Sequence, residues 1–291
     1  MNNITPIRQS PFNSESRLYF KVCERPDGWQ DKHGTWHADP NQKKLLRQDP
    51  VTDEPIILAT VGNKYQTVQN RELFEGIERA MIDTVPSQYL DGVTRSESLS
   101  YGGAVGLHDY LFPAMRVAFN EAVLRFRIVA RNGYGLSAVN VLAGAFDGYC
   151  MNGCVTGVAD QHYRRHTSGL KITGIEDVIK RAIDNFWIEA AQFKAWADVP
   201  LSHSRALECL ENIPGISKRL QGKLHARFLT EAQDRGPSVW ALYSAMTDYA
   251  SHDNVSPLRT TGKDHAAATR MQRAEQVAKW ARSRAFKALA A

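Results

Sequence analysis

The chain has 291 residues, of which 43% are hydrophobic and 23% are charged, a composition typical of a folded globular protein. Its four cysteines are too few for a disulfide framework, and it has no leader-like segment and no apolar run of the ~18 residues that a membrane helix needs, so we expect a cytoplasmic protein. The formal net charge is +5, and residues 258–291 alone carry eight basic and two acidic side chains, a distribution typical of a segment that contacts a polyanion.

The beginning of the chain is predicted to contain short strands. Apolar runs bounded by glycine, proline and aspartate indicate strands at 18–22 and 56–61. Between them, the Arg-Pro-Asp-Gly run at 25–28 predicts a turn. Residues 38–55, which contain three prolines, predict a long exposed loop.

The first predicted helix covers residues 71–84. Leu73, Ile77 and Met81 recur there at helical spacing, which indicates an amphipathic helix with one buried face. Asn70 precedes the apolar pattern and is expected to serve as the N-cap.

Residues 123–130 alternate apolar and polar side chains with a period of two, which predicts a half-buried strand. Arg125 and Arg127 lie on its polar face, and Arg131 follows one step later. The next four residues, Asn-Gly-Tyr-Gly, predict a tight hairpin, with residues 136–141 as the returning strand. Guanidinium groups that repeat in this way point in one direction and can each bind a phosphate. Arginines on a surface strand also serve solubility and edge protection, so both interpretations remain open.

Two cysteines and two histidines follow this hairpin at spacings that place each pair on one side of a helix. Cys150, Cys154, His162 and His166 could in that case form a tetrahedral zinc site. Only seven residues separate the two pairs, fewer than in common Cys₂His₂ sites, and glycines interrupt the segment. We therefore favour free cysteines and expect no metal and no other cofactor.

The second half of the chain is predicted to be helical from about residue 174 onward, with helices over 174–197, 201–229, 238–251 and 265–289. The second of these ranges is expected to be a helix pair broken at Ile213-Pro-Gly-Ile216. This run resembles the hairpin of helix-hairpin-helix DNA-binding motifs, in which backbone N–H groups bind phosphate. Lys218, Arg219 and Lys223 lie beside it. A proline-glycine break between two ordinary helices is the alternative.

The last predicted helix, 265–289, carries small residues along one side, which predicts close packing on another helix or on a neighbouring subunit. Its arginines, including Arg273, Arg282 and Arg284, are expected to face outward. Tyr134 and Tyr163 occur in polar, turn-like surroundings, so we expect exposed rings on which single-stranded bases can stack. Arg164, Arg165 and His166 are expected to contact phosphate beside them.

Short motifs in a fixed order resemble those of a known family. They are Lys64-Tyr65-x-x-Val68-x-Asn70, Arg131-Asn-Gly-Tyr-Gly135, Cys150-x-Asn152-Gly153, Arg165-His-Thr-Ser168 and the run from Trp240 to His252. Together, over about residues 60–255, they look like the phage and plasmid proteins grouped as the domain-of-unknown-function 932 family. The chain departs from that family at Asn132 and Tyr134, where a serine, histidine and aspartate type of run is expected. The resemblance implies a mobile-element origin and no particular biochemical activity.

These patterns predict an α+β protein with a strand-rich core of antiparallel hairpins at 1–172 and a helical region at 173–291 packed on it, ending in a long basic helix. We expect a non-enzymatic, sequence-independent nucleic-acid-binding protein that binds or anneals single-stranded DNA in phage or plasmid recombination or replication, as a homo-oligomeric ring or filament. The alternatives are an interaction protein that blocks a host defence protein and a metal-dependent nuclease. The candidate nucleic-acid-binding residues are Arg125, Arg127, Arg131, Tyr134, Tyr163, Arg164, Arg165, His166, Lys218, Arg219, Lys223, Arg273, Arg282 and Arg284.

Overall fold

The computed structural model describes residues 12, 15–119, 122–135, 138–147, 160–164, 174–254 and 266–290. Its N-terminal half forms two antiparallel sheets and its C-terminal half is helical, which confirms the predicted α+β class. The described part of the chain contains no helix that is long and apolar enough to cross a membrane.

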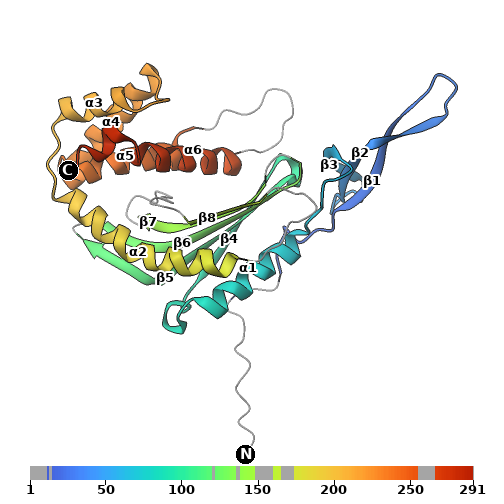
Figure 1. Ribbon diagram of the computed structural model, residues 1–291, viewed down its shortest axis with the longest axis horizontal. Helices are drawn as coiled ribbons and strands as arrows, with labels where there is room; N and C mark the ends of the chain where they lie inside the picture. The colour runs from blue at the N-terminus through green and yellow to red at the C-terminus, as the bar shows by residue number, and fades with distance from the viewer. Residues whose placement is uncertain are drawn as a thin grey trace, which may run out of the picture.

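The first sheet has three strands in the order β1-β2-β3, namely β1 (Cys23–Gln30), β2 (Trp36–Gln48) and β3 (Pro55–Gly62). Strands β1 and β2 project from the body as a long hairpin, here called the arm (Figure 1). The predicted turn at 25–28 and most of the predicted loop at 38–55 were wrong, because these residues belong to the arm. Its pairing shifts between Pro26 and Gly28, and this irregularity accommodates the prolines without ending the ladder.

The predicted strand at 18–22 was also wrong, because the first strand begins at Cys23. Leu18 is buried there. The side-chain amide of Gln69 donates to the Val22 carbonyl at 2.9 Å and accepts from the Val22 N–H at 3.0 Å. A side chain thus takes the two backbone hydrogen bonds that a neighbouring strand would have taken.

The second sheet, here called the main sheet, is a five-stranded antiparallel meander with its strands in chain order. The strands are β4 (Thr94–Ser100), β5 (Val105–Phe119), β6 (Ala122–Gly133), β7 (Val139–Asp147) and β8 (Asp160–Arg164). Short 3₁₀ turns, η1 (Ser87–Tyr89) and η2 (Tyr101–Gly103), flank β4. The hairpin predicted after 123–130 is present as the β6–β7 pair.

The alternation predicted for β6 separates the two faces of the main sheet. Leu124, Phe126 and Ile128 are buried in the principal core. We call this side the helix face, because α1 (Asn70–Thr84) and α2 (Ile175–Ala197) pack on it. The opposite side carries Arg125, Arg127 and Arg131 and is here called the arginine face.

The remaining helices form a layer above the arginine face (Figure 1). They are α3 (His203–Asn212), α4 (Lys218–Arg235), α5 (Val239–His252), α6 (Ala266–Ala281) and α7 (Arg284–Lys287). The single helix predicted at 265–289 is therefore two helices, since Ser283 caps α7 by accepting a hydrogen bond from the Phe286 N–H. Ala278 and Val277 of α6 are buried in contact with this layer, so part of the small-residue stripe packs within the same chain.

Candidate nucleic-acid interface

The arginine face brings together two arginines that the sequence did not show to be neighbours. Strands β5 and β6 pair so that Arg116 lies directly opposite Arg125, next to a register shift between Phe112 and Arg116. Directly opposed side chains point to the same side of a sheet, with Cβ atoms about 5 Å apart. Arg116 is exposed and Arg125 is partly exposed, and neither forms an ion pair with another described residue. Like charges placed in this way repel each other.

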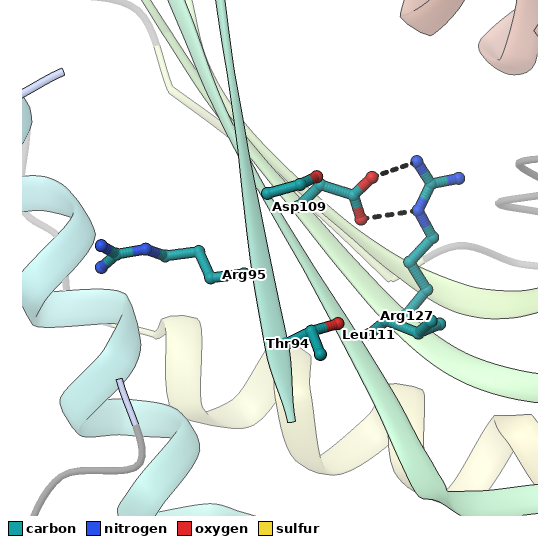
Figure 2. Close-up of a pocket in the computed structure, with 6 residues that line it drawn as sticks. Thr94, Arg95, Asp109, Leu111 and Arg127 are labelled. Carbon is teal, nitrogen blue, oxygen red and sulfur yellow. Dashed lines mark hydrogen bonds and ion pairs between the residues drawn. The ribbon is translucent and has the colours of Figure 1, made fainter. Parts of the chain in front are cut away.

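Arg127 lies two residues further along β6 and is already paired. Its Nε donates to Asp109 Oδ1 at 2.7 Å, and its Nη2 donates to Asp109 Oδ2. The two side chains remain 18% and 28% exposed. They line a pocket of about 160 Å³ with Thr94, Ser96 and Leu111. Figure 2 shows the Arg127–Asp109 pair on one side of the strands and Arg95 pointing to the other side.

Arg131, the third arginine of β6, is largely covered by α6. Its Nη2 lies 3.6 Å from Glu275 Oε1, and Asn140 Nδ2 donates to the same carboxylate oxygen at 3.0 Å. The Arg131 side chain is 12% exposed. Glu275 therefore holds α6 over this end of the arginine face. Arg131 is mostly buried in its contact with Glu275 and is little exposed to solvent.

Tyr134 is not the exposed ring that its polar surroundings predicted. It is completely buried between the two sheets, and its hydroxyl accepts a hydrogen bond from the Asn70 N–H at 3.2 Å. Burial raises the pKa of this phenol well above its usual range. The following Gly135 has a positive φ of 71° and lies against Ala59, so the chain turns tightly there and brings Tyr134 inside.

Asn70 was also misassigned as a helix cap. Gln69 occupies the N-cap position, while the Asn70 side chain is buried. Asn70 Nδ2 donates to the Leu18 carbonyl at 2.9 Å, and Asn70 Oδ1 accepts from Asn132 Nδ2 at 2.8 Å. These amides join the N-terminal segment, α1 and β6 through buried hydrogen bonds.

The predicted break between two helices is present at Ile213–Ile216. Gly215 adopts a positive φ of 84°, and Ser217 caps α4 by accepting a hydrogen bond from the Leu220 N–H at 3.3 Å. Lys218 and Arg219 are exposed in the first turn of α4, as the helix-hairpin-helix interpretation requires. An ordinary helix pair has the same turn, so phosphate binding here stays a prediction.

The other basic candidates in the helical layer are partly engaged within the protein. Lys223 Nζ lies 3.1 Å from Asp253 Oδ1, and Arg273 Nη1 donates to the Asp253 carbonyl at 2.7 Å. Arg282 is exposed, although its Nε donates to the Ala278 carbonyl. Arg284 is exposed at the start of α7.

Several predicted residues fall outside the part of the chain that the structure describes. These are Cys150, Cys154, Arg165 and His166. For His162, Tyr163 and Arg164 only the backbone in β8 is described, and the register places Tyr163 opposite Asn140 on the arginine face. Within the described residues no group of three or more His, Cys, Asp or Glu side chains is placed to hold a metal ion.

A buried polar network lies on the helix face, on the opposite side of the main sheet from the arginine face. Glu78 Oε1 accepts hydrogen bonds from Arg95 Nη1 at 2.8 Å and from the Tyr110 hydroxyl at 2.9 Å. His108 Nδ1 lies 2.8 Å from the Tyr110 hydroxyl, and its Nε2 lies 3.1 Å from Ser16 Oγ. Burial raises the pKa of Glu78 and lowers that of His108 to about 3. A fully buried, neutral imidazole is suited to holding the N-terminal segment against β5.

Comparison with known proteins agrees with the resemblance found in the sequence. The model of a family described as a domain of unknown function (DUF932) matches residues 57–284. The match extends from β3 to the start of α7 and so includes the whole main sheet. No curated protein and no solved structure matches the chain. Because the matched segment is well over half of its length, the chain belongs to the DUF932 family.

Proposed function

We propose that the protein binds single-stranded DNA without sequence specificity along the arginine face. The opposed pair of Arg116 and Arg125 is the observation that carries this proposal. Two guanidinium groups in this arrangement repel each other when no anion is present, and a phosphate bound between them replaces that repulsion with charge-assisted hydrogen bonds.

A nucleic-acid backbone suits this face better than a single small anion. Arg127 lies two residues from Arg125 on β6, which is about 7 Å along the strand, so it would bind the next phosphate on the same line once it is released from Asp109. Contacts of this kind fix the position of a backbone and carry no sequence information. A flexible single strand is favoured over a stiff duplex, because α6 covers the Arg131 end of the same face.

In the cell, this binding would serve strand annealing during phage or plasmid recombination or replication in the host cytoplasm. A homo-oligomeric ring or filament would extend the bound length by aligning the arginine faces of successive subunits. Annealing and oligomeric assembly both depend on the proposed binding.

The test is fluorescence anisotropy of a labelled single-stranded oligonucleotide at about 50 mM and about 200 mM salt, with duplex DNA as competitor. The Arg116→Ala/Arg125→Ala variant should reduce the salt slope of log K by about 0.7, the contribution of the one phosphate that the two arginines bind between them on a single strand. Lys218→Ala/Arg219→Ala removes the same charge from the helical layer and is the matched comparison.

Two results would overturn the proposal in different ways. No binding by the wild-type protein at the lower salt concentration would remove nucleic-acid binding altogether. A reduced slope only for the Lys218→Ala/Arg219→Ala variant would move the interface from the arginine face to the turn between α3 and α4.

A further inference from the structure

The tip of the arm exposes two large aromatic side chains. Trp29 on β1 is 58% exposed and Trp36 on β2 is 55% exposed. The arm extends away from the rest of the molecule, so the described protein does not cover its tip (Figure 1). Exposed indole rings on a projecting element are typical of binding sites, because water is a poor environment for them.

Trp29 is held in a fixed orientation by its neighbours. It lies opposite His37 in the β1–β2 ladder, and the two rings stack with centroids 5.6 Å apart and planes 24° from parallel. His37 Nε2 is in turn 2.9 Å from Asp31 Oδ2. The other carboxylate oxygen of Asp31 accepts the N–H groups of His33 and Thr35 and so shapes the turn. The imidazole therefore supports one face of the indole, and the opposite face is available to a further flat ring.

Trp36 lies on the other side of the arm. Its partner in the ladder is Gln30, and its ring packs over Gly28, where an added Cβ would lie 2.8 Å from Trp36 Cζ2. The two exposed indoles thus face in opposite directions. One flat protein surface would cover only one of them, whereas stacking with a base requires a single open ring face.

We propose that the Trp29–His37 pair is a base-stacking platform for the single-stranded DNA that the arginine face binds, so this inference rests on the proposed function. The charge at the tip fits this ligand. Asp31 is engaged by His37 and the turn amides, whereas Lys32 is exposed and forms no ion pair with any residue that the structure describes. A cation beside a flat ring is the combination that binds a nucleotide through its phosphate and its base together.

The platform is connected structurally to the arginine face. Strand β6, which carries the arginines, ends at Gly133, and the following Gly135 packs against Ala59 and Val61 of β3. Strand β3 pairs with β2, which runs into the arm. The end of β6 therefore lies next to the sheet from which the arm projects.

The experiment combines a side-chain change with a ligand change. Affinities of the wild-type protein, Trp29→Ala and Trp29→Phe are measured by anisotropy for a single-stranded oligonucleotide and for the same oligonucleotide with abasic sites. Trp29→Ala should weaken binding of the normal oligonucleotide by about 5- to 150-fold, the range for loss of one stacked base, with little change in salt slope. Trp29→Phe should keep most of the affinity, because it keeps a ring. The loss caused by Trp29→Ala should disappear with the abasic ligand.

The outcomes separate the two proposals. If the wild-type protein binds and Trp29→Ala binds equally well, the platform is wrong while binding by the arginine face stands. An equal loss for normal and abasic ligands also overturns the platform, since the effect then has another cause. A change in molecular mass by light scattering, without a change in affinity, would assign the tip to a protein interface instead. Without wild-type binding, the proposed function itself fails.

Discussion

Replacing Asp109 by asparagine should strengthen DNA binding. The substitution keeps the size of the side chain and removes the negative charge that neutralises Arg127. Arg116, Arg125 and Arg127 would then form a positively charged group without a neighbouring carboxylate among the described residues. If the released guanidinium gains one phosphate, the salt slope should steepen by about 0.7, and affinity at low salt should rise by about 10- to 150-fold, since a hydrogen bond to a charged group contributes about 1.5–3 kcal/mol. The ion pair is partly exposed, so its loss should reduce folding stability by only about 1 kcal/mol.

The assay is the same anisotropy titration at two salt concentrations, with urea denaturation to confirm that the variant is folded. Glu97→Gln is the control, because it makes the same change of charge on the helix face, where Glu97 lies 3.3 Å from Arg95. Equal slopes for Asp109→Asn and the wild-type protein would refute the reasoning, because Arg127 would then not reach a phosphate when freed. Equal tightening by Glu97→Gln would show that only the overall charge matters.

Two further predictions concern the buried polar groups. The pKa of His108 is lowered from 6.5 to about 3 in the folded protein, so the stability that its neutral form contributes is complete above pH 6.5 and is lost as the pH falls from 6.5 to about 3. At pH 5 the free energy of unfolding should already be about 2 kcal/mol lower than at neutral pH. In denaturant titrations at pH 7 and pH 5, His108→Gln should show a weaker pH dependence than the wild-type protein, and an unchanged dependence would argue against a neutral buried imidazole. Tyr134→Phe should destabilise the fold by about 1–3 kcal/mol, because the buried Asn70 N–H loses its acceptor, while DNA binding stays the same. Unchanged stability would argue against a buried hydrogen bond between the Asn70 N–H and the Tyr134 hydroxyl.

Periodicity in the sequence was sufficient for elements whose burial follows a simple pattern. The helix at α1 and the two faces of β6 were predicted correctly, because apolar residues at a period of 3.6 or 2 report directly on which side is buried. Strand β2 was missed because Pro40 lies where the ladder is irregular, and a proline at such a position does not interrupt the pairing.

The candidate site was less predictable, because it depends on register between strands. Arg116 was not identified as a site residue, and Asp109 was not identified as the partner of Arg127. Both relations follow from how β5 pairs with β6, and the register shift between Phe112 and Arg116 changes that pairing by several residues. A period-two pattern gives the face on which a side chain lies and leaves its cross-strand neighbour undetermined.

Two of the motifs that carry the family resemblance, Lys64–Asn70 and Arg131–Gly135, lie at the junction between the arm's sheet and the main sheet. The Tyr65 hydroxyl accepts from the Gly135 N–H at 3.2 Å, and Asn70 is hydrogen bonded to both Asn132 and Tyr134. Most of these groups are buried, and their hydrogen bonds fix the end of β6 against β3 and α1. That junction sets the position of the arm relative to the arginine face. If one DNA strand contacts both, a rigid junction lowers the entropy cost of binding, because the two contact regions are already aligned before the strand arrives.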